Sequence, residues 1–340
     1  MTKQLMAGMD LHSNNLFCGM VDGEGKRVFE KKLPCALPQV LQGLAPFKER
    51  LDTIAVESTY NWYWLVDGLQ AAGYRVHLAN TAAIKQYEGL KHSGDESDAA
   101  HLAQLLRLNI LPAGYICPPQ ERALRDLARK RLQLGRSRTS HILSVENIMT
   151  RQTGARIASR AVKALTEDAL QKLVQPEDVR LAMATNVAVI HTLSAQIDKI
   201  EARLRERVKP RAEFKLLTSA PGIGEVLSTV IMLETGTIER FAAVGNFASY
   251  ARCVDSKRIS NGKKKGVGNV KNGNRYLAWA FVEAAHFARR YCPEAKRFYE
   301  RKRARTNNIV ATKALAHKLA RACYHMLKEA KPFDVKRCFA

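Results

Sequence analysis

The sequence predicts an α/β region followed by a mostly helical remainder in this chain of 340 residues. Over the first hundred residues, short β-type runs alternate with helix-type runs, which is typical of a sheet flanked by helices. Pro112, Pro118 and Pro119 punctuate the chain where this alternation ends. Beyond them, apolar residues recur at helical spacing. The length allows about two domains and a connector. We expect three parts, residues 1–115, 116–212 and 213–340.

The order of elements in the first region predicts its topology. Three strands joined in hairpins come first, with a turn at Gly23-Glu24-Gly25, and helices then alternate with strands. This order gives a mixed sheet with helices on its faces, which is the ribonuclease-H-like arrangement. The strands are expected at residues 5–10, 15–21, 27–33, 53–56 and 75–79, and the helices at residues 38–51 and 62–72, from 81 and from 98.

Two long helices, residues 120–152 and 177–208, are expected in the middle of the chain. The second carries an apolar stripe with spacings of 3, 4, 3 and 4 residues, a coiled-coil-like pattern. Such a stripe packs against a second copy of the chain or forms a helical hairpin within one chain, and both alternatives stay open. The stripe consists of Ile190, Leu193, Ile197, Ile200 and Leu204.

The charge of the chain is concentrated behind residue 115. The whole chain carries 55 basic and 32 acidic side chains, a net charge of +23. Residues 1–115 hold 11 basic and 12 acidic side chains, and the remaining 225 residues hold 44 and 20, so the net charges are −1 and +24. Such a charge favours a polyanionic partner.

Composition excludes several classes of protein. No apolar run approaches the roughly 20 residues that a membrane helix needs, and the first nine residues are too short and too weakly apolar for a signal peptide. The seven cysteines are widely spaced and form no Cys-x-x-Cys pair. This pattern is typical of reduced thiols and argues against a disulfide framework or a zinc finger. We therefore expect a cytoplasmic protein with no membrane partner.

Four carboxylates form the main candidate site. Asp10 and Glu57 end the first and fourth strands, and Asp95 and Asp98 lie three residues apart where a helix begins. If these strands are neighbours, Asp10 and Glu57 meet at one edge of the sheet, and Asp95 and Asp98 share a helix face. Oxygen ligands suit one or two Mg²⁺ ions, which support phosphoryl transfer. The simpler alternative is that Asp95 and Asp98 only cap the helix.

A glycine-rich turn, Pro221-Gly222-Ile223-Gly224, separates two expected helices. It resembles a helix-hairpin-helix element, in which backbone N–H groups at Gly222 and Gly224 meet a phosphate. A tight turn between helices explains the same residues equally well.

A basic loop is expected at residues 256–273, between the helical segments of the last region. Its glycines permit close approach of a partner and its cations suit phosphates, although a disordered basic loop has the same composition. A serine in this loop, such as Ser260, becomes a nucleophile only if another group activates it. The expected nucleic-acid contacts here are Lys263, Lys264, Lys265, Lys271 and Arg275.

An aromatic cluster, Tyr60, Trp62, Tyr63 and Trp64, follows Glu57 directly. Aromatic rings can stack on exposed bases. Packing of a helix onto the sheet is the alternative that suits most of them.

Together these features resemble the DEDD transposases of insertion sequences, namely the "one-hundred-ten" family, its "eleven-eleven" subgroup and the related Piv-type invertases. The resemblance covers Met6 to about Leu327, and the matching pieces run in family order. The carboxylate spacing is fairly specific, and its combination with the late Ser/Gly/Lys block is highly specific. The pieces are Met9-Asp10-Leu11-His12, Glu57-Ser58-Thr59 with Trp62 to Leu65, Asp95-Glu96-Ser97-Asp98-Ala99, Pro221-Gly222-Ile223-Gly224, and Ser260 through Gly273-Asn274-Arg275.

The resemblance implies a RuvC-like domain, a coiled-coil connector and a C-terminal transposase domain with a helix-hairpin-helix-like turn. It implies that the four carboxylates bind Mg²⁺ while a C-terminal serine attacks DNA and forms a phosphoserine link. It also implies a structured bridge RNA that base-pairs with double-stranded donor and target DNA. A tetramer of paired dimers with composite active sites, acting at the bacterial nucleoid, follows from the same resemblance.

Alignment of the late block places the nucleophile at Ser260. The family commonly has Gly-Leu-x-Pro-Ser where this chain has Arg252-Cys253-Val254-Asp255-Ser256, and Asn261 follows Ser260 where glycine is often found. Ser256 is therefore a second candidate.

These features favour an RNA-guided DNA recombinase that excises and inserts a mobile element through serine attack and a Holliday-junction-like intermediate. The first alternative is a hydrolytic, RuvC-type junction nuclease, which uses the same carboxylates with water as the nucleophile. The second is a nucleic-acid-binding protein without enzymatic activity.

Overall fold

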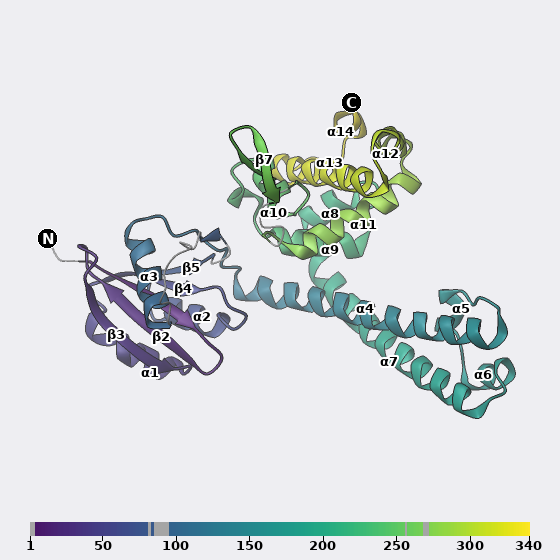
Figure 1. Cartoon of the computed structure of the whole chain (residues 1–340), viewed down its shortest axis with the longest axis horizontal. Helices are drawn as coiled ribbons and strands as arrows, with labels where there is room; N and C mark the ends of the chain where they lie inside the picture. The colour runs from purple at the N-terminus through teal and green to yellow at the C-terminus, as the bar shows by residue number, and fades with distance from the viewer. Residues whose placement is uncertain (1–3, 81–82, 85–94, 256, 268–271) are drawn as a thin grey trace. The chain divides into compact units, whose positions relative to one another are not determined.

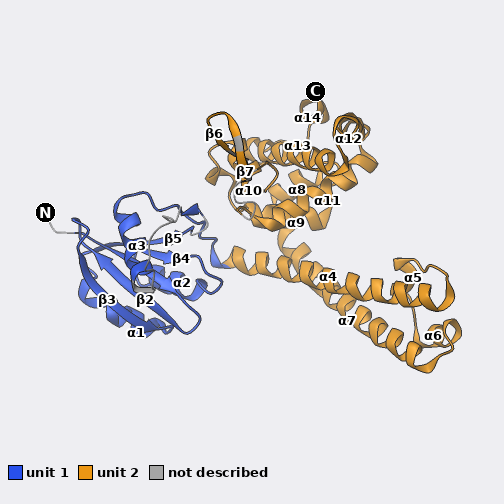
Figure 2. Ribbon diagram, viewed as in Figure 1, with its two compact units in different colours: residues 1–119 blue, residues 120–340 orange. Residues whose placement is uncertain are grey.

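The computed structural model describes residues 4–80, 83–84, 95–255, 257–267 and 272–340 (Figure 1). The chain forms two compact units, residues 1–119 and residues 120–340 (Figure 2). The short helix expected from residue 81 begins outside the described residues. No described helix is both long and apolar enough to cross a membrane.

The first unit contains a five-stranded sheet with the strand order β3-β2-β1-β4-β5. β1 pairs antiparallel with β2 and parallel with β4, β2 pairs antiparallel with β3, and β4 pairs parallel with β5. This mixed sheet confirms the predicted α/β class and is consistent with the ribonuclease-H-like arrangement. The strands are β1 (Leu5–Leu11), β2 (Asn15–Val21), β3 (Arg27–Pro34), β4 (Leu51–Glu57) and β5 (Val76–Ala79).

Alternate residues of the central strands serve two different faces of the sheet. Ala7, Met9 and Leu11 of β1 join a core with α1 (Leu37–Leu44) and α2 (Tyr63–Ala71). The helix expected at residues 38–51 ends early, because Pro46 cannot donate a helical hydrogen bond. The opposite face, which includes Ala55 and Ala79, packs against α3 (Asp95–Arg107).

Two glycines let α3 lie close to the sheet. A Cβ atom at Gly8 of β1 would lie 2.7 Å from the backbone nitrogen of Ala103 and closer still to the carbonyl oxygen of Ala99. A Cβ at Gly19 of β2 would lie 2.9 Å from the nitrogen of Ala100. These alanines are buried at the contact, so small residues on both elements fix the position of the helix.

The second unit begins with a pair of long helices, α4 (Pro119–Thr153) and α7 (Glu177–Val208), seen in Figure 1. Arg131 of α4 donates to Glu201 of α7 at 2.7 Å, and Arg138 donates to Ser194 at 3.1 Å. In the stripe expected on α7, Ile190, Ile197 and Leu204 are buried within this unit. The apolar stripe therefore serves a hairpin within one chain, and pairing with a second copy stays a prediction. The short helices α5 (Ser159–Lys163) and α6 (Glu167–Leu173) lie between the two long helices in sequence.

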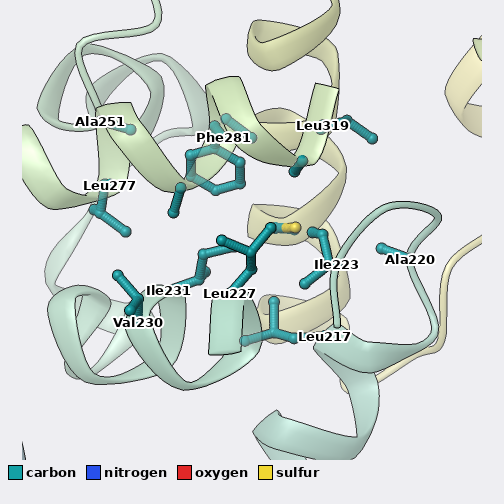
Figure 3. Packing of buried hydrophobic residues seen from close by; sticks show 14 of the residues in the cluster. Leu217, Ala220, Ile223, Leu227, Val230, Ile231, Ala251, Leu277, Phe281 and Leu319 are labelled. Carbon is teal, nitrogen blue, oxygen red and sulfur yellow. The ribbon is translucent and has the colours of Figure 1, made fainter. Parts of the chain in front are cut away.

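The rest of the second unit is a helical bundle around one apolar core, which confirms the predicted helical character. Phe281 of α11 packs among Leu217, Ile223 and Leu227 (Figure 3). Phe247 of α10 is also fully buried in this core. The helices are α8 (Ala212–Thr218), α9 (Glu225–Thr235), α10 (Val244–Tyr250), α11 (Arg275–Tyr291), α12 (Pro293–Arg305), α13 (Asn308–Glu329) and α14 (Val335–Phe339).

The expected basic loop contains a β-hairpin, formed by β6 (Lys257–Ser260) and β7 (Lys263–Val267). Asn261 and Gly262 connect the strands with φ angles of 48° and 70°. Positive φ at both positions is the conformation that an Asn-Gly two-residue hairpin turn requires. The Asn-Gly dipeptide was therefore the sequence signal for a hairpin, and the expectation of a plain loop was wrong.

Candidate active site

The pairing of β1 with β4 brings Asp10 and Glu57 together. The parallel register aligns Gly8 with Ala55 and Met9 with Val56, so the next residues of the two strands are Asp10 and Glu57. Both side chains lie on the α3 face, because each is two residues beyond a residue that contacts α3. Asp10 is only 6% exposed and Glu57 is half-buried.

Ionisation of both carboxyl groups is energetically unfavourable, because the two negative charges lie close together in a partly buried site. The pKa of Glu57 is raised from its ordinary value of 4.5 to about 8, first by burial and then by a hydrogen bond to Asp10 and the negative charges of Asp10 and Asp98. A carboxyl group that is desolvated beside other carboxylates holds its proton. Glu57 therefore holds its proton more tightly in the folded protein than an exposed glutamate does.

Helix α3 contributes a third carboxylate. Asp98 lies in its first turn and is exposed, yet its charge acts on Glu57. The close docking of α3 on Gly8 and Gly19 places this turn near the end of β1. Asp95 is the first residue of α3, but its side chain lies outside what the structure describes. The structure thus brings together three of the four expected carboxylates.

A histidine also belongs to this site. Nε2 of His12 lies 3.2 Å from Oδ2 of Asp10. The carbonyl oxygen of His12 accepts a hydrogen bond from Asn61 Nδ2 at 2.9 Å, which ties the loop after β4 to the turn after β1. His12 stood in the matching motif, but sequence reasoning gave it no role. Its place two residues after Asp10, on the same side of an extended chain, was the available signal.

The donor chemistry of this cluster fits a divalent cation. Burial and the neighbouring negative charges raise the pKa of Glu57, and a divalent cation with oxygen ligands would stabilise its charged form. Among the described residues, no three His, Cys, Asp or Glu side chains are already arranged as a metal cluster.

Ser260 lies in the other unit, at the end of β6. It pairs with Lys263 across the hairpin and is exposed. Lys263 and Lys265 are also exposed, whereas the side chain of Lys264 is not described. Two further expected residues, Ser256 and Lys271, lie outside the described part of the chain.

Arg275 opens α11 and is exposed, and its Nη2 donates to the Tyr276 hydroxyl at 3.0 Å. Lys263, Lys264 and Lys265, which are also expected to contact nucleic acid, belong to β7 of the hairpin instead. The expected cations therefore occupy two different elements of the same unit.

The two glycines of the turn before α9 differ in their surroundings. Gly222 has a φ of 82°, and a Cβ there would lie 2.5 Å from the nitrogen of Ala288 in α11. Gly222 therefore allows close packing of the turn on α11. A Cβ at Gly224 would meet nothing within 4 Å, and Gly224 is the N-cap residue of α9. Gly224 is the more open of the two, and phosphate contact at either stays a prediction.

Sequence reasoning missed a buried polar network near the start of α11. Glu234 of α9 accepts two hydrogen bonds from Arg129 of α4, at 2.6 and 2.7 Å. It also accepts from Asn274 Nδ2 at 2.7 Å, while Oδ1 of Asn274 accepts from the backbone N–H groups of Tyr276 and Leu277. Buried charges need such partners, and the network joins α4, α9 and α11. The separation of 105 residues between Arg129 and Glu234 hid it.

Comparisons with known proteins identify the family to which the chain is similar. A transposase family model of the IS110 DEDD type matches residues 7–154, which include the carboxylate cluster. A second model, described as "Transposase IS116/IS110/IS902 family", matches residues 214–300, which include Ser260. Together the two models cover more than two thirds of the chain.

Individual relatives point the same way. The "Probable family 20 transposase" of Pseudomonas aeruginosa is 24% identical over 290 residues, 81% of this chain and 83% of the relative. The "Transposase for insertion sequence element IS1328" of Yersinia enterocolitica is 21% identical over 342 residues, 97% of this chain and 98% of the relative. An IS110 protein of Streptomyces coelicolor is 25% identical over 154 residues, 45% of this chain and 37% of its own length. The chain therefore belongs to the IS110 family of DEDD transposases, enzymes of DNA recombination.

Proposed function

We propose that this transposase is an RNA-guided DNA recombinase that excises and inserts a mobile element through serine attack on DNA. The observation that carries the proposal is the cluster of Asp10, Glu57 and Asp98 at one edge of the sheet, with the raised pKa of Glu57. Exposure of Ser260 at the tip of a basic hairpin supports it. Excision and insertion proceed through a Holliday-junction-like intermediate in this proposal.

DEDD transposases use a divalent metal ion, and we propose Mg²⁺, held by Asp10, Glu57, Asp98 and Asp95. When bound, the ion supplies stabilisation of negative charge on the phosphate that reacts. The carboxyl groups themselves orient the site, since Asp10 is buried and keeps a hydrogen bond to Glu57. Nε2 of His12 also lies 3.2 Å from Oδ2 of Asp10.

The proposed chemical step exchanges one phosphate ester for another. The Ser260 hydroxyl oxygen bonds to the phosphorus atom, the bond from phosphorus to one sugar oxygen breaks, and the serine proton compensates the charge of the displaced sugar oxygen. A phosphoserine link and a free sugar hydroxyl result, so no water or nucleotide cofactor is consumed. Attack by another sugar hydroxyl on the phosphoserine reverses the step and joins the new strand.

The charge of the second unit supports the proposed nucleic-acid partners. Residues 120–340 carry 44 basic and 20 acidic side chains, a net charge of +24. This excess suits donor DNA, target DNA and a structured bridge RNA that supplies sequence choice by base pairing. The cations next to Ser260 and the turn at Gly222 and Gly224 are the proposed backbone contacts, namely Lys263, Lys264, Lys265, Lys271 and Arg275.

The proposed assembly is a dimer that pairs into a tetramer. The carboxylates belong to residues 1–119 and Ser260 belongs to residues 120–340. Because separate units supply the two halves of the site, one copy can provide the serine for the carboxylates of another. In this proposal residues 1–115 form the RuvC-like domain, 116–212 the connector and 213–340 the transposase domain. The enzyme works on the bacterial nucleoid in the cytoplasm.

A covalent-trapping assay tests the proposal. The full chain is mixed with Mg²⁺, the partner RNA and labelled DNA, and denaturation-resistant adducts are mapped by mass spectrometry. We expect an adduct on Ser260 that disappears in Ser260→Ala and in Asp10→Asn. Ser256→Ala is the control for the second candidate serine and should keep the adduct. Cleaved ends without any adduct, unchanged in Ser260→Ala, would instead identify a hydrolytic junction nuclease.

A further inference from the structure

Tyr60 is an exposed aromatic residue at the edge of the sheet that carries the carboxylates. It follows Glu57 by three residues, in the loop between β4 and α2, and is 83% exposed. Its neighbour Trp62 is only 8% exposed and joins the core of the first unit. Tyr63 and Trp64 are partly buried against the same core. Packing therefore accounts for three members of the aromatic cluster, and Tyr60 is the exception.

The loop that carries Tyr60 is held in place. Thr59 Oγ1 donates to Asn61 Oδ1 at 2.9 Å, and Asn61 Nδ2 donates to the carbonyl oxygen of His12 at 2.9 Å. The His12 side chain in turn contacts Asp10. The residues on both sides of Tyr60 thus fasten it to the carboxylate site. Three residues of extended chain reach at most about 10 Å, so Tyr60 stays within one or two nucleotides of a phosphate bound there.

The exposed ring of Tyr60 is suited to contact with a flat, apolar group. Tyr60 makes no hydrogen bond or ring contact with the residues that the structure describes, so nothing there uses its ring. The first unit has 11 basic and 12 acidic side chains, and its net charge of −1 gives no general attraction for a phosphate backbone. Stacking on a base is independent of that charge and is worth about 1–3 kcal/mol per base.

We propose that Tyr60 forms a stacking site for an unpaired nucleobase beside the phosphate that reacts. The inference rests on the proposed function, because it assumes that the carboxylates receive a DNA phosphate. It adds a requirement, since a base within a paired duplex has both faces covered. The DNA next to the reacting phosphate must therefore be locally unpaired when it occupies the site.

Equilibrium binding tests this site without relying on catalysis. The full chain, carrying Ser260→Ala so that DNA stays uncleaved, is titrated in Mg²⁺ with two labelled duplexes, one fully paired and one with a short unpaired stretch. Stacking tolerates any sequence, so the target site need not be known. We expect tighter binding of the unpaired probe by about 5-fold to 150-fold. Because the ratio of the two affinities is compared, the contribution of general charge cancels.

Variants of Tyr60 decide the outcome. Tyr60→Ala should reduce the ratio of affinities to about one, and Tyr60→Phe should keep it, because the ring is retained. Tyr291→Ala is the matched control, since Tyr291 is 74% exposed but belongs to the second unit. An unchanged ratio in Tyr60→Ala would overturn the inference, and so would an equal loss in Tyr60→Phe. Failure of the proposed function shows elsewhere, as a missing Ser260 adduct in the trapping assay.

Discussion

At the residue scale, the proton on Glu57 links the acidic site to stability. The pKa of Glu57 is raised to about 8 in the folded protein, chiefly by burial, against an ordinary value of 4.5. The folded state therefore holds this proton more tightly than the unfolded chain does. The resulting stabilisation is complete below about pH 4.5 and is lost as the pH rises through about 8.

Glu57→Gln should remove this pH dependence, because glutamine cannot lose a proton. In chelator, the melting temperature of the wild-type protein should fall between about pH 5 and pH 9 more steeply than that of the variant. Glu49→Gln, at an exposed glutamate of the same unit, is the control and should follow the wild type. Parallel curves for wild type and Glu57→Gln would show that the Glu57 proton does not contribute.

The sequence could predict which site residues lie together where their position at the end of a strand determines it. Asp10 and Glu57 end strands that the pattern identified, so their meeting followed from strand order. The exposure of Tyr60 depends on how a loop is held in place after folding. The packing of Gly222 on α11 depends on a helix more than sixty residues away. Local pattern carries no information on such contacts.

At the element scale, the docking of α3 on the sheet controls the third carboxylate. Gly8→Ala puts a Cβ 2.7 Å from the backbone nitrogen of Ala103 and closer still to the carbonyl oxygen of Ala99. Backbone atoms cannot rotate away, so the helix must shift and carry Asp98 from Glu57. We expect a loss of roughly 1–3 kcal/mol in the free energy of unfolding and weaker binding of Mg²⁺ by calorimetry.

Gly23→Ala is the control for this prediction, because a Cβ at Gly23 would meet nothing within 4 Å. It should match the wild type in both measurements. If Gly8→Ala also unfolds and binds Mg²⁺ like the wild type, the close approach of α3 does not position the carboxylates.

Elements in the first unit were predicted better than those around Ser260. In the sheet, β-type runs predicted each strand, and the structure confirms the predicted mixed sheet. The β6–β7 hairpin has lysines where a strand usually shows alternation, so only the turn residues Asn261 and Gly262 marked it. The apolar stripe on α7 predicted the helix correctly, but its partner α4 is decided by the connection between them and not by the stripe itself.

At the scale of the whole molecule, the two units differ in net charge. Residues 1–119 have a net charge of −1 and hold the carboxylates, whereas residues 120–340 have a net charge of +24 and hold Ser260. Carboxylate oxygens favour a bound metal ion, whereas a cationic surface favours contact with phosphates. We therefore expect the first unit to act on the phosphate that reacts and the second to retain the nucleic acid.

Exposed cations at the end of α12 should contribute to the binding of DNA. Every residue from 301 to 310 is exposed, and Arg301, Lys302 and Arg305 form no ion pair with the described residues. Replacing these three by glutamine should weaken binding to DNA of any sequence. The slope of log affinity against log salt concentration should become shallower by about three, because each phosphate contact contributes about 0.9. Fluorescence anisotropy at several salt concentrations measures this slope.

The matched control neutralises the same number of cations in the first unit. Lys26, Lys31 and Arg50 are exposed there, and their replacement by glutamine changes the total charge of the protein by the same amount. If binding depends on local contacts, this variant should keep the wild-type slope. An equal change of slope in both triple variants would mean that only the total charge matters, and a flat salt response in the wild type would mean that these cations face solvent.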